Sequence, residues 1–250
     1  MAARTDHDER AEADAGAETA APKRRGASRL AMAVSILGEL LITAGLVLGL
    51  FVVYSLWWTN VVADRKADKQ GDKVRDNWAQ DKGGPGALDT KDGIGFLHVP
   101  SMKNGEVLVE KGTSTKVLND GVAGYYIDPV KATLPMTDKT GNFTLAAHRD
   151  GHGAKFHNID KIKKGDPIVF ETKDDWYVYK VFSILPETSK YNVKVLQPVP
   201  KQSGRTKPGH FITLTTCTPV YTSEYRYIVW GELERVQKVD SARTPPKELG

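Results

Sequence analysis

The feature that most constrains this chain is an uncharged run of 19 residues, Leu40–Trp58, which reads LLITAGLVLGLFVVYSLWW. A helix needs about 20 predominantly apolar residues to cross the hydrocarbon core of a bilayer. The run continues upstream to residue 30 with a single charge, Glu39, and it ends in aromatic side chains of the kind that favour a membrane interface. The sequence therefore predicts one transmembrane helix over residues 30–58.

The flanking charges predict the orientation of this helix. A cluster of four basic residues closely precedes it, namely Lys23, Arg24, Arg25 and Arg29, whereas the first basic residue after it is Arg65. Because Lys and Arg are retained on the cytoplasmic side, we expect a cytoplasmic N-terminus and the bulk of the chain outside the cell, in a single-pass plasma-membrane protein. The alternative is a cleaved signal peptide ending at Val61-Val62-Ala63, although its apolar region would be shorter, about 7–15 residues.

The remaining chain divides by composition. Of 250 residues, 40% are hydrophobic and 26% charged, as in globular proteins, and a net charge of +4 is too balanced for a dedicated nucleic-acid binder. Residues 1–29, which lack aromatic side chains, predict a disordered cytoplasmic tail.

Residues 59–86 are highly charged and end in KGGPG, which indicates mainly a stalk that only places the next domain, although Lys66–Trp78 allows a short helix. Residues 87–236 are then one domain, followed by a flexible tail over 237–250.

Within residues 87–236, short runs of β-branched and aromatic residues alternate with Gly, Pro, Asn and Asp clusters. The expected strands are Ile94–Val99, Val107–Glu110, Phe143–Ala147, Pro167–Glu171, Trp176–Ile184, Phe211–Cys217 and Tyr225–Val236. Helical periodicity is weak and confined to Thr115–Leu118 and Ala154–Ile159. The pattern predicts a mainly β domain, either an antiparallel barrel or a sandwich.

Cys217 is the single cysteine, and it ends one of these runs immediately before Thr218-Pro219. Because proline has no N–H, the strand should stop there and leave the thiol at a loop-bordered cleft. A single cysteine excludes an intrachain disulfide framework, and in an extracellular domain it indicates a reactive thiol. A buried structural cysteine is the alternative.

A nucleophilic thiol needs a base or a cation beside it. His148 ends the run Phe143–Ala147, in the same strand-end position as Cys217, so the two share one rim if their strands are neighbours. Arg226 opens the strand after Cys217, and an antiparallel return about 5 Å away brings it back toward the thiol, where it can bind an oxyanion. The alternative for Arg226 is a surface ion pair with Glu224 or Glu232.

A zinc site is the other interpretation of the histidines. His148, His152 and His157 could supply three ligands, as in catalytic zinc centres. Their spacing would place ligands together only within a helix, and Gly151 and Gly153 disfavour a helix there. We therefore expect no metal.

These residues stand in motifs that resemble those of the sortases, the membrane-anchored cysteine transpeptidases of Gram-positive bacteria. TLTTC (Thr213–Cys217), followed by Arg226, resembles the cysteine motif, and LAAHRD (Leu145–Asp150) resembles the histidine motif. IGFLHVP, GVAGYY, WYVYKV and YIVWGEL resemble further segments, so the resemblance covers residues 90–236 and extends to the N-terminal anchor.

The resemblance implies an eight-stranded, mostly antiparallel β-barrel with short helices. It implies that Cys217 is the nucleophile, His148 the general acid/base and Arg226 the residue that stabilises the oxyanion. Sortases cleave a C-terminal sorting signal such as LPxTG between Thr and Gly through a thioester, and transfer the protein to a cell-wall amine. The implied partners are sorting-signal-bearing surface proteins, a peptidoglycan precursor amine and the plasma membrane, without nucleic acid. We expect no cofactor and no calcium site.

The charged stalk, the Tyr-Tyr pair and the Ala/Arg/Asp-rich tail resemble class E, an actinobacterial class that favours LAxTG. We expect Tyr125, Tyr126 and Thr216 to bind substrate. Tyr126 falls where other sortases carry an acidic groove residue, and a phenol there could hydrogen-bond the amide N–H that Ala has and Pro lacks. Tyrosines that merely pack one end of the barrel are the alternative. For the whole domain, the alternative is a non-catalytic or hydrolytic cell-wall module, which would not need the Cys/His/Arg set.

Overall fold

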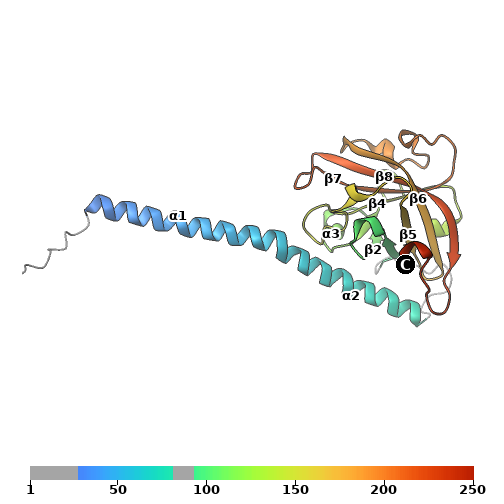
Figure 1. Ribbon diagram of the computed structural model, residues 1–250, viewed down its shortest axis with the longest axis horizontal. Helices are drawn as coiled ribbons and strands as arrows, with labels where there is room; N and C mark the ends of the chain where they lie inside the picture. Colours follow the sequence, from blue (N-terminus) through green and yellow to red (C-terminus); the bar gives the residue numbers. More distant parts are fainter. Residues whose placement is uncertain (1–27, 81–92) are drawn as a thin grey trace, which may run out of the picture. The chain divides into compact units, whose positions relative to one another are not determined.

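The computed structural model describes residues 28–80 and 93–250. The apolar segment forms helix α1 (Arg29–Val53), which is long and apolar enough to cross a membrane, so the prediction of one such helix is confirmed. A π-helical segment, η1 (Tyr54–Trp58), follows it. The chain divides after Leu48 into two units, and the second contains helix α2 (Thr59–Ala79) and all the strands (Figure 1). The disordered tail predicted for residues 1–29 falls almost wholly outside the described residues.

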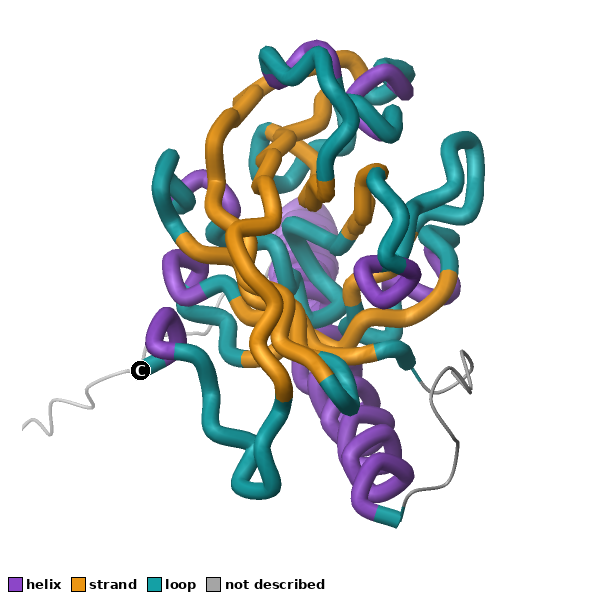
Figure 2. Tube along the Cα trace, turned by 90° about the vertical axis from the view of Figure 1, so that its right-hand side faces the viewer, coloured by secondary structure: helices purple, strands orange, loops and turns teal. Residues whose placement is uncertain are grey.

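The strands form a closed barrel in the order β1-β2-β3-β4-β7-β8-β6-β5, wrapped around a common interior (Figure 2). Their bounds are β1 Gly95–His98, β2 Glu106–Lys111, β3 Ala123–Tyr125, β4 Gly141–Ala146, β5 Pro167–Glu171, β6 Asp175–Ser189, β7 His210–Thr218 and β8 Tyr225–Lys238. The short helices are α3 (Thr115–Leu118) and the 3-10 turns η2 Pro100–Met102, η3 Pro135–Thr137, η4 Ile159–Lys161, η5 Val193–Leu196, η6 Lys201–Ser203 and η7 Lys247–Leu249. The predicted barrel with short helices is confirmed.

The barrel is not purely antiparallel, because the strand pairs β2/β3 and β4/β7 are parallel. Parallel neighbours need a crossover connection, and β4 and β7 are joined through β5 and β6. The sequence pattern missed β3, because it is only three residues long. It also wrongly predicted helix at Ala154–Ile159, where the structure has turns that lead into η4.

The barrel interior holds the largest apolar cluster of the described residues. Side chains with essentially no exposure line it from every side, among them Leu97, Val109, Leu145, Ile168, Phe170, Ile212, Leu214 and Val229. Burying one such side chain contributes about 1.5–3 kcal/mol relative to leaving it exposed. The strand ends that carry the candidate site are therefore fixed to a well-packed scaffold.

Residues 59–79 form α2 and pack on the barrel, which differs from the linker that we expected. Ala63, Ala67, Gly71 and Val74 recur at helical spacing and are buried. The apolar cluster that they join on the barrel contains Phe96, Leu108 and Val122, with Trp78 and Val117 packed against it. Small residues carry this face and charged residues fill the rest of the helix, so the hydrophobic signal in the sequence is weak.

The C-terminal segment also differs from the flexible tail that we expected over residues 237–250. Strand β8 continues to Lys238, and Arg235 on it pairs with Glu248 at 2.6 Å. The guanidinium of Arg243 lies 2.7 Å from the buried carboxylate of Glu171, and Leu249 packs on a cluster around Trp176. This segment is therefore tied to the barrel.

Candidate active site

Three strand ends bring Cys217, His148 and Arg226 to one rim of the barrel. In the β7/β8 ladder, Cys217 lies directly opposite Arg226. The last pair of the parallel β4/β7 ladder is Ala146 opposite Thr215, and His148 follows two residues beyond the end of β4. Because neighbouring strands lie about 4.8 Å apart, Cys217 and Arg226 start from adjacent backbone positions, and His148 follows the end of the strand on the other side of β7.

The threonines of the TLTTC motif fix this register. The hydroxyl of Thr215 donates to the carbonyl oxygen of Leu145 at 3.0 Å, and the hydroxyl of Thr216 donates to that of Ala147 at 2.7 Å. Both threonines are buried. The side chains before the cysteine therefore bind the strand before the histidine, which holds Cys217 and His148 at one level.

Arg149 adds a buried cation to the same junction. Its side chain is 6% exposed, and its Nη1 donates to the hydroxyl of Thr218 at 2.8 Å and to the carbonyl of Cys217 at 3.4 Å. Its Nη2 donates to Asp160 at 3.1 Å. Asp150 in turn accepts the backbone N–H of Tyr221 at 2.6 Å. The two residues after the histidine thus hold the end of β7 and the loop that follows it.

His148 is oriented by Asn119, at the end of α3. The Nε2–H of His148 donates to the Oδ1 of Asn119 at 2.8 Å, which leaves Nδ1 free to accept a proton. Burial lowers the pKa of His148, and the nearby His152, whose ring centroid is 5.5 Å away, lowers it further, while Asp150 opposes them. His148 is therefore a neutral base at neutral pH, and a stronger acid than ordinary histidine once it is protonated.

Arg226 and Tyr126 flank a small cavity next to the cysteine. The cavity has a volume of ≈ 90 Å³ and is lined by strands β6, β7 and β8, by the β6–β7 connection and by the segment after β3, in part by Tyr126, Thr188, Val193, Leu196, Thr215 and Arg226. The Nη1 of Arg226 donates to the carbonyls of Ser223 and Tyr225 at 3.1 and 2.9 Å. Of the two carboxylates that could have paired with it at the surface, Glu232 binds Arg205 and Glu224 hydrogen-bonds Tyr225.

Tyr126 has a defined hydrogen-bond direction. Its hydroxyl lies 2.9 Å from the Oγ1 of Thr215, and the hydrogen of Thr215 already points to Leu145. The phenol of Tyr126 is therefore the donor, and its oxygen keeps the capacity to accept a hydrogen bond. Burial raises the pKa of Tyr126, so the phenol stays protonated at neutral pH, although Thr215 and Arg226 lower that pKa in part.

The other two residues expected to bind substrate are buried. Tyr125 is 5% exposed and belongs to the apolar cluster inside the barrel. Thr216 is buried, with its hydroxyl bonded to Ala147. Sequence reasoning missed Asn119, Arg149 and Thr215. A signal existed for the last two, since they stand inside the two motifs, whereas nothing local to Asn119 indicates that it meets a histidine 29 positions away.

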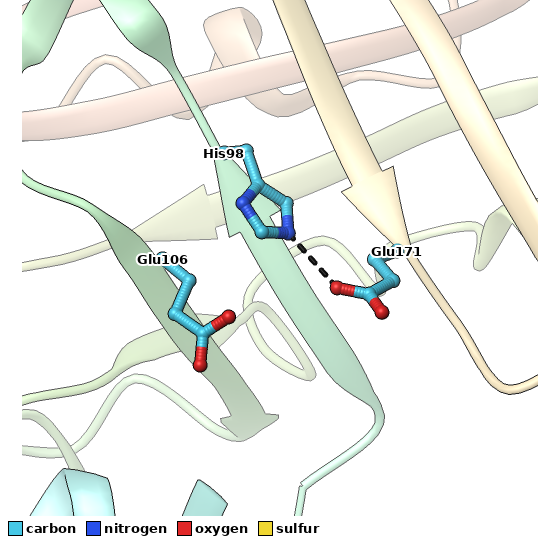
Figure 3. Close-up of side chains that lie close together, drawn as sticks. All are labelled: His98, Glu106 and Glu171. Atoms are coloured by element: carbon cyan, nitrogen blue, oxygen red, sulfur yellow. Dashed lines mark hydrogen bonds and ion pairs between the residues drawn. The ribbon is translucent and has the colours of Figure 1, made fainter. Parts of the chain in front are cut away.

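The three histidines of the zinc alternative do not form a ligand group among the described residues, although the rings of His148 and His152 are neighbours. The Nδ1–H of His157 donates to the carbonyl of Arg149 at 2.9 Å, while Nε2 of His148 is bonded to Asn119. Across residues 28–80 and 93–250, the group with metal-ligand geometry is instead His98, Glu106 and Glu171 (Figure 3).

The two carboxylates of this second group are already paired with cationic side chains. Arg75 of α2 reaches Glu171 at 3.1 Å and Glu106 at 2.5 Å, Arg243 reaches Glu171 at 2.7 Å, and the Nε2–H of His98 donates to Glu171 at 3.0 Å. Burial would raise the pKa of Glu171, but hydrogen bonds from His98, Arg75 and Arg243 lower it to about 2. Two guanidinium groups occupy the space around the carboxylates, which favours an ionic clamp over a metal centre.

Comparisons with known proteins identify relatives of this chain. The sequence model of the Sortase domain matches residues 97–234. The chain is 71% identical to Sortase SrtE2 of Streptomyces coelicolor, with 100% of both chains covered. It is 49% identical to Sortase SrtE1 of the same organism, over 79% of this chain and 56% of the relative.

Two solved structures resemble the barrel unit. The structure of sortase E1 from Streptomyces coelicolor, with a tripeptide in its active site, gives a TM-score of 0.59 at 48% identity and covers 63% of this chain and 96% of that chain. Sortase E from Streptomyces avermitilis gives a TM-score of 0.54 at 31% identity, covering 63% of this chain and 97% of that one.

Proposed function

Because the chain belongs to the sortase family of cysteine transpeptidases, which anchor proteins to the cell wall, we propose that Cys217, His148 and Arg226 perform its acyl transfer. The observation that carries this proposal is that Cys217 pairs with Arg226 across β7 and β8, while His148 follows the end of β4, the other neighbour of β7. A non-catalytic wall-binding module would not need a base and a cation at the two backbone positions beside its single thiol.

In the first step, the thiolate of Cys217 attacks the threonine carbonyl of the sorting signal. His148 takes the proton of the Cys217 thiol as the thiolate forms; the C–S bond then forms, the C–N bond to glycine breaks, and His148 gives this proton to the departing amine. In the second step, an amine of a cell-wall precursor attacks the thioester and gives its proton to neutral His148, and the thiolate leaves. His148 alternates between two protonation states, and its lowered pKa makes the protonated form a stronger acid toward the departing amine.

Arg226 stabilises the negative charge that develops on the carbonyl oxygen in both steps. A guanidinium offers five N–H donors, and the two carbonyls that bind its Nη1 fix its plane without using all of them. A fixed cation that is present before the reaction stabilises an oxyanion without the cost of reorganising solvent.

We propose that the sorting signal is of the LAxTG type and that Tyr126 reads the second residue. The oxygen of Tyr126 is free to accept a hydrogen bond, because its hydrogen is directed to Thr215. Alanine at that place in the signal has an amide N–H to donate, and proline has none. Cleavage of LAxTG and LPxTG peptides by one preparation, compared as kcat/KM, tests this preference.

We propose that the N-terminus is cytoplasmic and the barrel extracellular. The support is the cluster Lys23–Arg29 before α1, together with the need of a cell-wall transpeptidase to meet its amine outside the membrane. Protease added to intact protoplasts should degrade the barrel and spare a tag on the N-terminus. A barrel that is protected until the cells are lysed would refute this orientation.

The proposed chemistry is tested by the mass of the protein during turnover. A barrel incubated with an LAxTG peptide should gain the mass of the acyl fragment on Cys217, and Cys217→Ala should not. Hydrolysis that proceeds without any acyl-enzyme would refute covalent transfer through this residue.

A further inference from the structure

We infer that helix α2 belongs to the support of the active site, and that Asn60, Asp64 and Lys66 on it are positioning residues for His148. The inference rests on the proposed role of His148. It reverses our sequence-based expectation that the segment after the membrane span only places the domain.

The loop that follows His148 is held by the first turns of α2. The backbone N–H of Gly153 donates to the Oδ1 of Asn60 at 2.8 Å, and the Nζ of Lys155 donates to the Oδ1 of Asp64 at 2.9 Å. The side chain of Lys155 is only 12% exposed, so this ion pair is partly shielded from water. A shielded pair is screened less by salt than a pair at the surface.

The same loop is joined back to the histidine. The backbone N–H of Phe156 donates to the carbonyl oxygen of His148 at 3.0 Å, and the side chain of Phe156 is fully buried. The loop therefore runs between two fixed points, α2 on one side and the backbone of His148 on the other. A shift of the loop on α2 would move the histidine.

A second path from α2 reaches the imidazole through its hydrogen-bond partner. The Nζ of Lys66 lies 2.5 Å from the Oδ1 of Asp120. Asp120 directly follows Asn119, whose Oδ1 accepts the Nε2–H of His148. Both the backbone and the ring of the histidine are thus one or two contacts from the same helix.

Two glycines show how closely these loops approach the helix. A Cβ on Gly121 (φ +77) would lie 2.8 Å from the carbonyl oxygen of Ala63. A Cβ on Gly153 (φ +81) would lie 2.9 Å from the Oδ1 of Asp64 and 3.2 Å from the Cα of Gly121. The left-handed backbone and the lack of space both favour glycine, so α2 and the two loops meet in a close-packed junction.

The far end of α2 is held independently, which fixes the helix as a platform. Arg75 binds Glu171 and Glu106, and its guanidinium carbon lies 4.1 Å from the ring centroid of Phe96. Val74 is buried in the same region. A helix that is held at both ends can fix the position of His148, whereas a loose linker cannot.

The test uses the full-length protein in lipid nanodiscs, with the double variant Asn60→Ala/Asp64→Asn and the matched control Asp68→Asn. Asp68 is exposed on the same helix, so the control makes the same charge change away from the loop. We expect the double variant to lose about 10- to 100-fold in kcat, because a misplaced catalytic group is costly even at 1 Å. KM and the fraction of Cys217 that can be acylated should stay at the values of the control.

If Asn60 and Asp64 only stabilised the fold, their substitution would lower the fraction of Cys217 that can be acylated and leave kcat per active site unchanged. The two measurements therefore distinguish a positioning role from a purely structural one. The exchanged pair Asp64→Lys/Lys155→Asp should restore part of the kcat that Asp64→Lys alone loses. A double variant whose kcat and pH profile equal those of Asp68→Asn, or whose loss is explained by the acylated fraction, overturns the inference. His148→Ala is measured in parallel, since an active His148→Ala would refute the proposed function itself.

Discussion

Cys217 and Arg226 lie directly opposite each other across the antiparallel β7/β8 ladder. Residues paired in this way project from the same face of a sheet, with Cβ atoms about 4.5–5.5 Å apart. The side chains of Cys217 and Arg226 therefore project in the same direction, and a carbonyl bound at the sulfur lies beside a permanent cation. The structure obtains this neighbourhood from strand register alone, without any long-range loop.

This pairing predicts that Arg226→Lys keeps the fold but loses activity. Lysine retains the charge but replaces a rigid fork of donors by a flexible point charge. Loss of one oxyanion donor typically lowers the rate about 10²- to 10³-fold, and we expect kcat/KM for peptide cleavage to fall in this range. Near-normal kcat/KM in a folded Arg226→Lys protein would show that the guanidinium is only a surface group.

His148→Ala should lose transpeptidation by about 10²- to 10⁴-fold, the usual contribution of a general acid/base. His152→Ala should stay within a few-fold of the parent in turnover. It should nevertheless move the acidic limb of the pH profile upward, because His152 is one of the groups that lower the pKa of His148. Equal losses of transpeptidation activity in the two variants would favour a metal site, and activity measured with a chelator would then test that site.

Tyr126→Phe should reduce the preference for LAxTG over LPxTG. One net hydrogen bond contributes about 0.5–1.5 kcal/mol, so the ratio of kcat/KM values should fall by about 2- to 13-fold. Tyr125→Phe is the matched control, because Tyr125 lies inside the barrel and should leave the ratio unchanged. A ratio that Tyr126→Phe leaves at its original value would exclude this readout of the signal.

The ionic clamp at Glu171 predicts acid sensitivity. Its pKa is about 2 in the folded protein against an ordinary 4.5, so the folded state favours the ionised form. This contribution to the free energy of unfolding is complete above the ordinary value and is lost as the pH falls from about 4.5 toward 2, by on the order of 3 kcal/mol. Unfolding by denaturant at several pH values measures it, and Glu171→Gln should flatten the loss. An equally steep loss in Glu171→Gln would assign the acid sensitivity to other groups.

The sequence predicted the parts of the fold that have strong local signals. Runs such as Phe211–Cys217 and Pro167–Glu171 carry enough β-branched and aromatic residues to identify β7 and β5. The short β3 and the small-residue face of α2 gave weak signals, because three residues hold little periodicity and alanines bury little surface. Cys217, His148 and Arg226 were found from motif and order, whereas Asn119 depends on how α3 packs against a distant strand end.

As a transpeptidase, this barrel would transfer an acyl group from Cys217 to an amine rather than to water. The most direct measurement follows the two products of an LAxTG peptide, with and without a glycine peptide or a diaminopimelate-containing stem as the amine. We predict slow hydrolysis without amine, a shift to the amide product with it that is favoured toward mildly alkaline pH, and neither product from Cys217→Ala. If the hydrolysis yield stays the same whichever amine is added, the account of Cys217, His148 and Arg226 as a transpeptidase centre is contradicted.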